Sequence, residues 1–232
     1  MIVFQPVFLL IGDICIVGTQ IYKINSYYQK NLIELCSFAA SIRFKINSSE
    51  WLKNEKSRQS QKTLSNHLGD FHQQILGSLD GWESLSSGQM VDIVNHDKKI
   101  IGEVKNKHNT LKGSDKAPMY SKLENLVMQK GHMYKGYTAY YIEIIPKKSK
   151  RYNIEFIPSN AATGASCSKN PLIRQIDGYS FYALATGVDD ALEQLFEVIP
   201  TVISNLQPEF KIDKGQSDEF IKKFFKSAFQ AK

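Results

Sequence analysis

The chain has little cysteine, and the cysteines it has are poorly placed for cross-linking or for zinc. Cys15, Cys36 and Cys167 are three among 232 residues. They are odd in number and widely spaced, so they form neither a C-x-x-C zinc pair nor a disulfide framework. The sequence also lacks internal repeats and low-complexity tracts. A globular protein of the reducing cytoplasm is therefore expected.

The first nineteen residues are apolar but lack the features of an export signal. No Lys or Arg precedes the apolar run, and Gln5-Pro6 and Asp13 interrupt it. A buried strand or helix is favoured over a signal peptide or a membrane span, although export stays open. We expect no membrane partner. Residues 1–50 form an N-terminal segment of uncertain role, and residues 51–232 are expected to form the main domain.

The overall composition is that of an ordinary globular protein with a modest basic excess. Hydrophobic residues make up 42% and charged residues 22%, and the length allows one substantial core. Lys and Arg outnumber Asp and Glu by 29 to 23, which gives a net charge of +6 and a pI near 9.0. Such an excess suits a phosphate-rich partner, but many basic proteins bind no nucleic acid.

Apolar periodicity predicts helices and strands in alternation. Leu68, Phe71, Ile75 and Leu79 recur at spacings of three and four, which indicates one face of an amphipathic helix. Later helices are predicted over 119–130, 188–206 and 217–229.

Strands are predicted within 90–109, over 137–145 and over 152–157. The last two read as a hairpin joined by the basic turn 147–151. The order of elements predicts a mixed α/β fold, in which helices flank a central sheet.

The segment 90–109 reads as two short apolar strands joined by a polar turn. Asp92 lies in the first strand, and Glu103 and Lys105 lie two residues apart in the second, so the latter pair shares one face. Asp92 can lie beside them across the hairpin. Two carboxylates held together repel unless a cation lies between them. Mg²⁺, a hard divalent ion with oxygen ligands, resolves this conflict and can bridge to a phosphate oxygen.

These residues meet the requirements of phosphodiester hydrolysis. Mg²⁺ held by Asp92, Glu103 and the backbone carbonyl of Val104 would polarise the phosphate and lower the pKa of a bound water. Lys105 would position or deprotonate that water, or stabilise charge in the transition state. On spacing alone, an E-x-K pair is more often the charged face of an edge strand. The apolar neighbours favour buried strands, in which charged residues need partners.

The same residues carry a resemblance to a known family. Asp92, Glu103 and Lys105 match the PD-(D/E)XK nuclease pattern, with Val91 where the pattern has proline. The string IGEVKNKHNT at 101–110, followed by KGSDK at 112–116, resembles one group of type II restriction endonucleases, those that cut GG-N-CC or GG-W-CC sites. Further similar strings stand at 67–73, 136–141 and 173–182, so the resemblance covers roughly residues 65 to 205.

The resemblance implies a PD-(D/E)XK, restriction-endonuclease-like α/β fold, with Mg²⁺ as cofactor and double-stranded DNA as substrate. It implies cleavage at a short palindromic, GC-bounded site. A palindrome has two-fold symmetry, which a homodimer matches when each subunit cuts one strand. A cognate DNA methyltransferase of the same system would protect host DNA. Residues 51–232 would then be the catalytic and DNA-recognition domain.

Several polar residues near the motif are candidates for DNA contact. Asn106, Lys107, His108 and Asn109 follow Lys105 without a break and are expected to contact the DNA backbone. The alternative is a solvated strand end, or a structural hydrogen bond for His108. The resemblance also implies a Glu or Gln that points from the first core helix towards the metal. Gln73 suits this position, unless it merely faces water.

Other candidates lie further along the chain. Lys112 and Lys116 are expected to contact phosphates, and Ser114 to reach a base. Arg174 and Asp177 are the candidates for base reading, because Arg bonds bidentately to guanine and Asp accepts from cytosine N4. An internal ion pair between Arg174 and Asp177 is an equal alternative.

Two other functions stay open from the sequence. One is a repair or junction-resolving nuclease of the same fold. The other is a DNA-binding module that has lost catalysis.

Overall fold

The structure is a computed structural model in which residues 47–86, 88–206 and 214–229 are described. The apolar run at the N-terminus, and almost all of the segment 1–50, lie outside these residues. Within the described ranges, no helix is both long enough and apolar enough to cross a bilayer.

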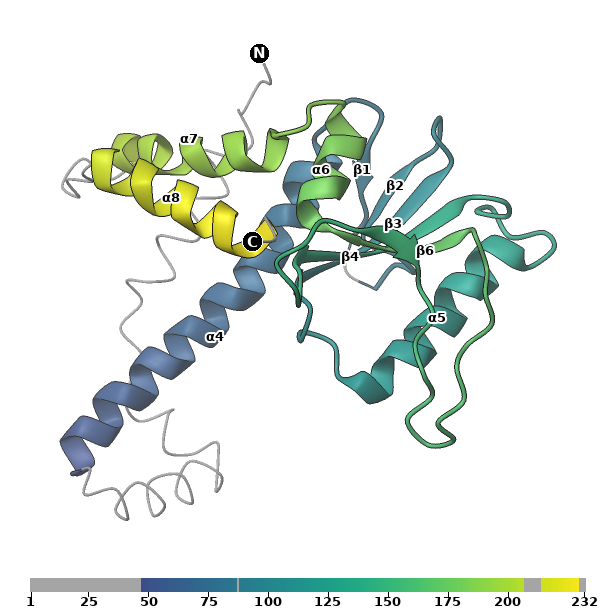
Figure 1. The fold of residues 1–232 in the computed structure, drawn as a ribbon, viewed down its shortest axis with the longest axis horizontal. Coiled ribbons are helices and arrows are strands. Elements are labelled where there is room, and N and C mark those ends of the chain that lie inside the picture. Colours follow the sequence, from purple (N-terminus) through teal and green to yellow (C-terminus); the bar gives the residue numbers. More distant parts are fainter. Residues whose placement is uncertain (1–46, 87, 207–213, 230–232) are drawn as a thin grey trace.

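A six-stranded mixed sheet forms the centre of the molecule (Figure 1). Its strands, in spatial order, are β1 (Glu83–Ser84), β2 (Ile93–Asn95), β3 (Ile100–Lys107), β4 (Thr138–Ile145), β6 (Ile173–Asp177) and β5 (Asn153–Glu155). The three central strands β3, β4 and β6 are parallel. Antiparallel strands complete the sheet on both sides.

Helices cover both faces of this sheet. They are α4 (Ser48–Gly77), α5 (Gly113–Met128), α6 (Gly178–Thr186), α7 (Ala191–Leu206) and α8 (Lys214–Phe229). In Figure 1, α5 lies on one side of the sheet, whereas α6, α7, α8 and the C-terminal part of α4 lie on the other. The N-terminal part of α4 projects away from the sheet (Figure 1).

Strand alternation divides the buried side chains into two cores. Ile101 and Tyr141 belong to the core under α5, whereas Val104, Tyr140 and Ile142 belong to the core shared with α4, α6, α7 and α8. Successive residues of a strand point to opposite faces. Odd-numbered residues of β3 therefore face α5, and even-numbered residues face the other layer.

The predicted mixed α/β architecture is confirmed, with helices on both faces of a mixed sheet. The helix expected near Leu68–Leu79 is the C-terminal part of a longer helix, because α4 runs unbroken from Ser48. It therefore crosses position 50, where the sequence suggested a boundary.

The start predicted for the next helix is wrong, since α5 begins at Gly113 rather than at 119. Gly113 and Pro118 indicate a loop when read as a pattern. In the structure Pro118 lies inside the helix, where its missing N–H leaves only the Ser114 carbonyl without a helical partner. Burial of Ala117 and Tyr120 against the sheet stabilises this first part of α5.

The predicted hairpin of 137–145 with 152–157 is also wrong. β6 lies between β4 and β5 and pairs with both, in parallel with β4 and antiparallel to β5. Local sequence patterns predict the two strands, but they do not predict that β6 lies between them, because β6 comes from a later part of the chain.

A buried histidine joins α4 to α6. The Nδ1 atom of His72 lies 2.9 Å from the Tyr182 hydroxyl, and both side chains are fully enclosed. Burial lowers the pKa of His72 to about 3. The ring is therefore neutral at physiological pH and serves packing, because burial disfavours the charged imidazolium.

The start of α6 packs directly on β4. A methyl group at Gly178 would lie 2.6 Å from the carbonyl oxygen of Ile144 and 2.7 Å from its Cα atom. Those atoms belong to the backbone of a central strand and cannot move aside cheaply.

We therefore expect Gly178→Ala to lower the free energy of unfolding by about 1–3 kcal/mol through overpacking. Gly113→Ala is the matched control, since Gly113 is also the first residue of a helix but has no described atom within 4 Å of the added methyl. Urea unfolding of both variants measures the difference. Equal stabilities would contradict the close contact at Gly178.

Candidate functional site

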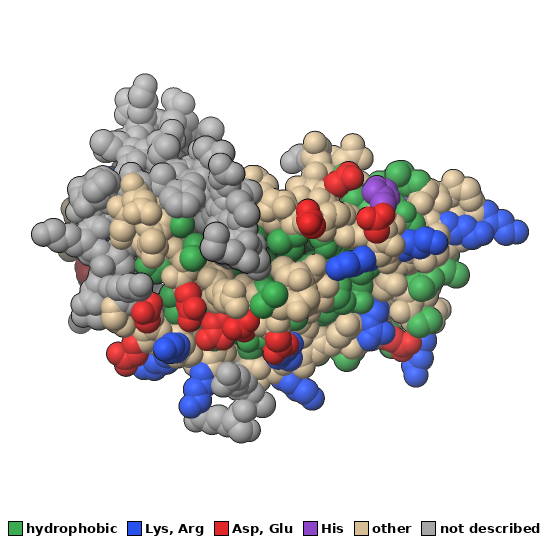
Figure 2. Space-filling view, turned by 90° about the horizontal axis from the view of Figure 1, so that it is seen from above, with side chains coloured by type: hydrophobic (Ala, Val, Ile, Leu, Met, Phe, Trp, Pro, Cys, Tyr) green, Lys and Arg blue, Asp and Glu red, His purple; other side chains and the backbone are tan. Residues whose placement is uncertain are grey.

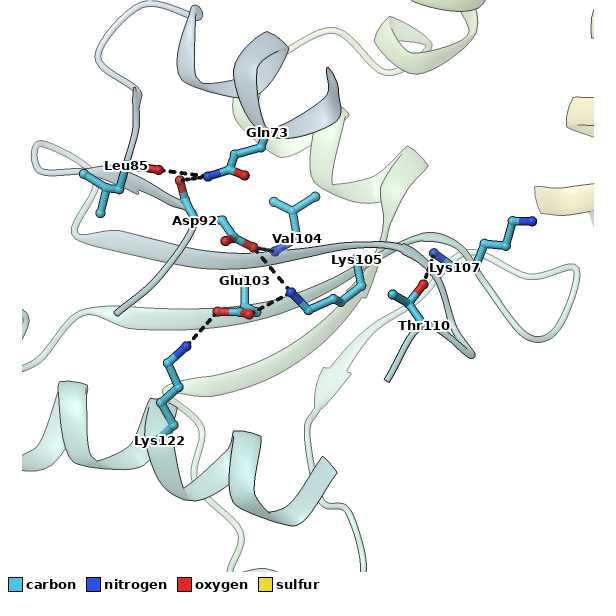
Figure 3. Close-up of polar contacts among 9 residues, drawn as sticks. All are labelled: Gln73, Leu85, Asp92, Glu103, Val104, Lys105, Lys107, Thr110 and Lys122. Carbon is cyan, nitrogen blue, oxygen red and sulfur yellow. Dashed lines mark hydrogen bonds and ion pairs between the residues drawn. The ribbon is translucent and has the colours of Figure 1, made fainter. Parts of the chain in front are cut away.

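Asp92 is held at the edge of the site by the backbone of β3. It immediately precedes β2, and its N–H donates to the Gly102 carbonyl at 3.0 Å. Its carboxylate oxygen Oδ2 accepts the Val104 N–H at 2.7 Å (Figure 3). The sequence predicted Asp92 inside the strand. It instead stands one residue before the ladder, where its side chain can cap the next free amide of β3.

Glu103 and Lys105 lie on the α5 face of β3, as their spacing predicted. The Lys105 ammonium is 2.7 Å from Glu103 Oε1 and 3.6 Å from Asp92 Oδ2. It thus lies between the two carboxylates (Figure 3). The structure brings together the three residues that the sequence proposed as catalytic.

The two acids influence one another through space. The pKa of Asp92 is raised above its usual value, first by burial and then by the negative charge of Glu103, while Lys105 acts in the opposite sense. Acidic groups that disfavour each other's ionisation are stabilised by a shared cation. Two oxygen donors of this kind fit a hard divalent metal.

The backbone of Val104 could provide a further ligand. In an antiparallel ladder the N–H and C=O of one residue point to the same neighbouring strand. The Val104 N–H points to Asp92, so the Val104 carbonyl faces the same side of β3. Val104 lies beyond the pair of Ile93 with Gly102, so β2 does not pair with it. No group of three His, Cys, Asp or Glu residues in the described ranges could hold a metal. A metal here would therefore need backbone or water ligands besides the two carboxylates.

A second lysine, which the sequence did not suggest, reaches the site from α5. The Lys122 ammonium lies 3.2 Å from Glu103 Oε2, the oxygen that Lys105 leaves free (Figure 3). Helical periodicity places Lys122 on α5 but does not show that it meets a strand residue nineteen positions earlier. Only the packing of α5 on the sheet brings the two groups together.

The site borders a second buried acid, Glu143, which the sequence did not single out either. Glu143 is opposite Lys105 in the ladder of β3 and β4. Its carboxylate accepts from Lys116 at 3.0 Å, the Tyr152 hydroxyl at 2.6 Å and the Gln175 amide at 2.9 Å. One signal was present: an acid inside the apolar strand 137–145 needs buried partners.

The Glu143 contacts revise the role expected for Lys116. Its ammonium neutralises a carboxylate that is 2% exposed, so it is not a free cation for a DNA phosphate. Burial, followed by the neighbouring Glu143, raises the pKa of Tyr152 and keeps its hydroxyl as a donor.

Gln73 reaches the site but contacts the backbone. Its side-chain amide donates to the carbonyls of Leu85 and Asp92, at 3.0 and 3.1 Å (Figure 3). It therefore joins α4 to the segment that carries Asp92. Gln73 thus points towards the site, as expected, but its amide nitrogen is used within the protein and not for DNA.

Four of the predicted DNA contacts are exposed where the chain passes from the end of β3 to the start of α5, next to the site. Lys107 and Thr110 close a turn, with the Lys107 N–H bonded to the Thr110 hydroxyl at 3.1 Å and the Thr110 N–H to the Lys107 carbonyl at 3.0 Å. Among the exposed residues of this stretch are Lys107, Asn109, Lys112 and Ser114. We call these four residues the β3–α5 connection.

Two neighbouring candidates face inward instead. Asn106 is buried and, as an even-numbered residue of β3, points away from Glu103 and Lys105. His108 donates its backbone N–H to the Ile145 carbonyl, and its Nδ1 atom is buried without a hydrogen-bond partner in the described part of the chain. The expected phosphate contact is therefore wrong for Asn106, and only part of the His108 ring is accessible.

Asp177 is a structural residue rather than a base reader. It is fully buried, caps α6 by accepting the Ser180 N–H, and also accepts the Tyr152 N–H at 2.6 Å. Arg174 donates to the side chain and carbonyl of Asn153, at 2.6 and 2.7 Å. Arg174 and Asp177 form no ion pair with each other, so the alternative of an internal ion pair between them is wrong as well. Arg174 stays partly exposed at the edge of the sheet.

Charge of both signs is distributed over the surface. The face drawn in Figure 2 carries acidic and basic side chains next to one another, with hydrophobic side chains between them. It is not a uniformly basic surface, in keeping with the modest net charge of +6.

Comparison with known proteins identifies the family. The sequence matches the model of the Eco47II restriction endonuclease family over residues 16–207. It is 46% identical to the type II restriction enzyme Eco47II of Escherichia coli over 179 residues, 75% of each chain. It is 31% identical to the type II restriction enzyme Sau96I of Staphylococcus aureus over 176 residues, 74% of this chain and 66% of that enzyme.

No solved structure matches this chain significantly. The two enzymes and the family match confirm the resemblance read from the strings around Glu103, which lie within the matched residues. The chain therefore belongs to the Eco47II family of type II restriction endonucleases.

Proposed function

We propose that this chain is a Mg²⁺-dependent type II restriction endonuclease. It hydrolyses phosphodiester bonds in double-stranded DNA at a short palindromic, GC-bounded site of the GGNCC type. The observation that carries the proposal is the Lys105 ammonium, 2.7 Å from Glu103 and 3.6 Å from Asp92 on the neighbouring strand. A PD-(D/E)XK fold is part of the proposal, supported by this placement of the three residues.

The metal would be held by Asp92, Glu103 and the Val104 carbonyl. When bound, Mg²⁺ supplies charge neutralisation at the scissile phosphate and a water of lowered pKa. Asp92 is oriented for this task by the Val104 amide, which fixes one of its oxygens. Lys105 is within hydrogen-bonding distance of Glu103, and its ammonium can orient the attacking water and stabilise negative charge at the phosphate.

The β3–α5 connection is well placed to contact DNA. Lys107 and Lys112 are exposed and form no ion pair with any described residue. Lys107 ends the strand that carries the catalytic pair and Lys112 precedes α5, so both can contact the DNA backbone near the scissile phosphate. Asn109 lies between them and Ser114 follows Lys112 in the first turn of α5, and both can reach the sugar, phosphate or base edges.

The assembly follows from the symmetry of the substrate. A palindromic duplex presents two equivalent scissile bonds, and a homodimer brings one site to each. Residues 51–232 would act together as the catalytic and recognition domain. A DNA methyltransferase of the same specificity is the expected companion, through modification of host DNA rather than physical contact.

Cleavage products test the function directly. Purified protein is incubated with plasmid DNA and Mg²⁺, and the ends are sequenced. We expect discrete fragments whose ends share one GGNCC-type sequence. Nicking that follows DNA structure instead of sequence would indicate a repair or junction nuclease. The absence of cutting at every metal concentration would refute both enzymatic functions.

Removal of any catalytic group should separate binding from cutting. We expect Asp92→Ala, Glu103→Gln and Lys105→Ala each to lower the cleavage rate at least about a hundredfold, because each group acts on the reacting phosphate or its metal. Specific binding measured with Ca²⁺ should persist. Lys130→Ala, at an exposed position beyond the end of α5, is the control and should cut normally. If one of the three variants cuts at nearly the normal rate, the role assigned to the residue that it replaces is wrong.

The two residues first considered for base reading should behave in opposite ways. Arg174→Ala is expected to lose about 1–3 kcal/mol of discrimination between the cognate duplex and single-base variants. Asp177→Ala is expected instead to lose about 1–3 kcal/mol of stability, because the N–H groups of Tyr152 and Ser180 lose their buried acceptor. Duplex titrations in Ca²⁺ and urea unfolding measure the two effects. An unchanged site preference in Arg174→Ala would remove that residue from recognition.

A further inference from the structure

Both oxygens of Glu103 are paired with lysines from two different elements. The ammonium of Lys105 on β3 lies 2.7 Å from Oε1, and the ammonium of Lys122 on α5 lies 3.2 Å from Oε2. The Glu103 side chain is 8% exposed, so water can replace neither partner fully. A metal that binds Oε2 of Glu103 competes with the Lys122 ammonium for the same oxygen.

The charges of the site balance without a metal. Asp92 and Glu103 contribute two negative charges, and Lys105 and Lys122 contribute two positive ones. If Lys122 were absent, Lys105 alone would face two carboxylates in a partly buried site. A buried carboxylate left in excess is costly, so the second lysine compensates for it.

Lys122 is the lysine that can be displaced. Its side chain is 40% exposed, against 20% for Lys105. Lys105 touches both acids from the same sheet, whereas Lys122 touches Glu103 alone from the helix above it. A long, half-exposed side chain with one ion pair to a described residue can swing to solvent once another cation binds Glu103, because that cation replaces the positive charge beside the buried carboxylate.

We propose that Lys122 is the counter-ion of the metal-free site and competes with the divalent cation for Oε2 of Glu103. This inference rests on the proposed metal site. In the free enzyme the ammonium weakens metal binding by occupying the ligand and by opposing the charge of the incoming ion. A DNA phosphate offsets that opposition, since its negative charge can receive the displaced ammonium. Lys122 thereby couples metal binding to the presence of DNA.

A purely structural ion pair would behave differently. Its removal would lower stability and would either leave metal affinity unchanged or weaken it by disordering Glu103. Competition has the opposite sign, because loss of the ammonium frees a ligand oxygen and leaves the site with a net charge of −1. Metal affinity in the absence of DNA therefore distinguishes the two roles.

The test is calorimetric titration of the full-length protein with Mn²⁺ in the absence of DNA. Lys122→Met keeps the aliphatic stem and removes the charge, and we expect it to bind Mn²⁺ roughly three- to tenfold more tightly than the parent protein. Lys122→Arg keeps the charge and should stay close to the parent. Lys130→Met removes an exposed charge outside the site and is the matched control. Thermal melting establishes that each variant is folded.

Failure of this inference and failure of the metal site give different results. If Glu103→Gln leaves Mn²⁺ binding intact, the proposed metal site itself is wrong. If Glu103→Gln abolishes binding while Lys122→Met binds Mn²⁺ no more tightly than the parent, the site stands and the competition is refuted. A gain of affinity in Lys122→Met with a smaller gain on duplex DNA would support both competition and its coupling to DNA.

Discussion

The hydrogen bond from the Val104 amide to Asp92 is the contact on which the site depends. Val104 lies beyond the pair formed by Ile93 and Gly102, so β2 offers its amide no backbone partner, and the Asp92 side chain accepts from it instead. The bond fixes the position of Asp92 along β3. Because side chains alternate along a strand, Glu103 and Lys105 share one face of β3, where the Lys105 ammonium lies between the two carboxylates. A shift of register by one residue would send both side chains into the apolar core of the other layer.

The helix α5 completes what the hairpin begins. As the crossover between parallel strands β3 and β4, it must lie over one face of the sheet, and this is the face of Glu103. It brings Lys122 to Glu103 and Lys116 to Glu143. The same helix starts beside the exposed β3–α5 connection, so charge balance within the site and access to DNA share one element.

The sequence predicted the parts of this arrangement that are local. Apolar alternation and the E-x-K spacing were sufficient for the shared face of Glu103 and Lys105. They were not sufficient for Lys122 and Glu143, whose partners lie 19 and 27 residues away. Asn106 was predicted to contact DNA because it directly follows Lys105. Adjacent residues of a strand point to opposite faces, so Asn106 lies on the other face of β3. Asp177 was considered for base reading although Asp before an apolar run is a common N-cap; its burial and its bond to the Tyr152 N–H depend on distant packing that the local pattern does not show.

The partners of Glu143 also set an order of assembly during synthesis. Lys116 precedes this acid in the chain, but Tyr152 and Gln175 follow it, the first directly before β5 and the second on β6, the two strands at the far edge of the sheet. Chains emerge from the ribosome N-terminus first. Asp92, Glu103 and Lys122 are thus available well before Glu143 has its full set of donors. The hairpin of β2 and β3 can form on a growing chain, but Glu143 on the neighbouring strand β4 has all its donors only after residue 175 has joined the sheet.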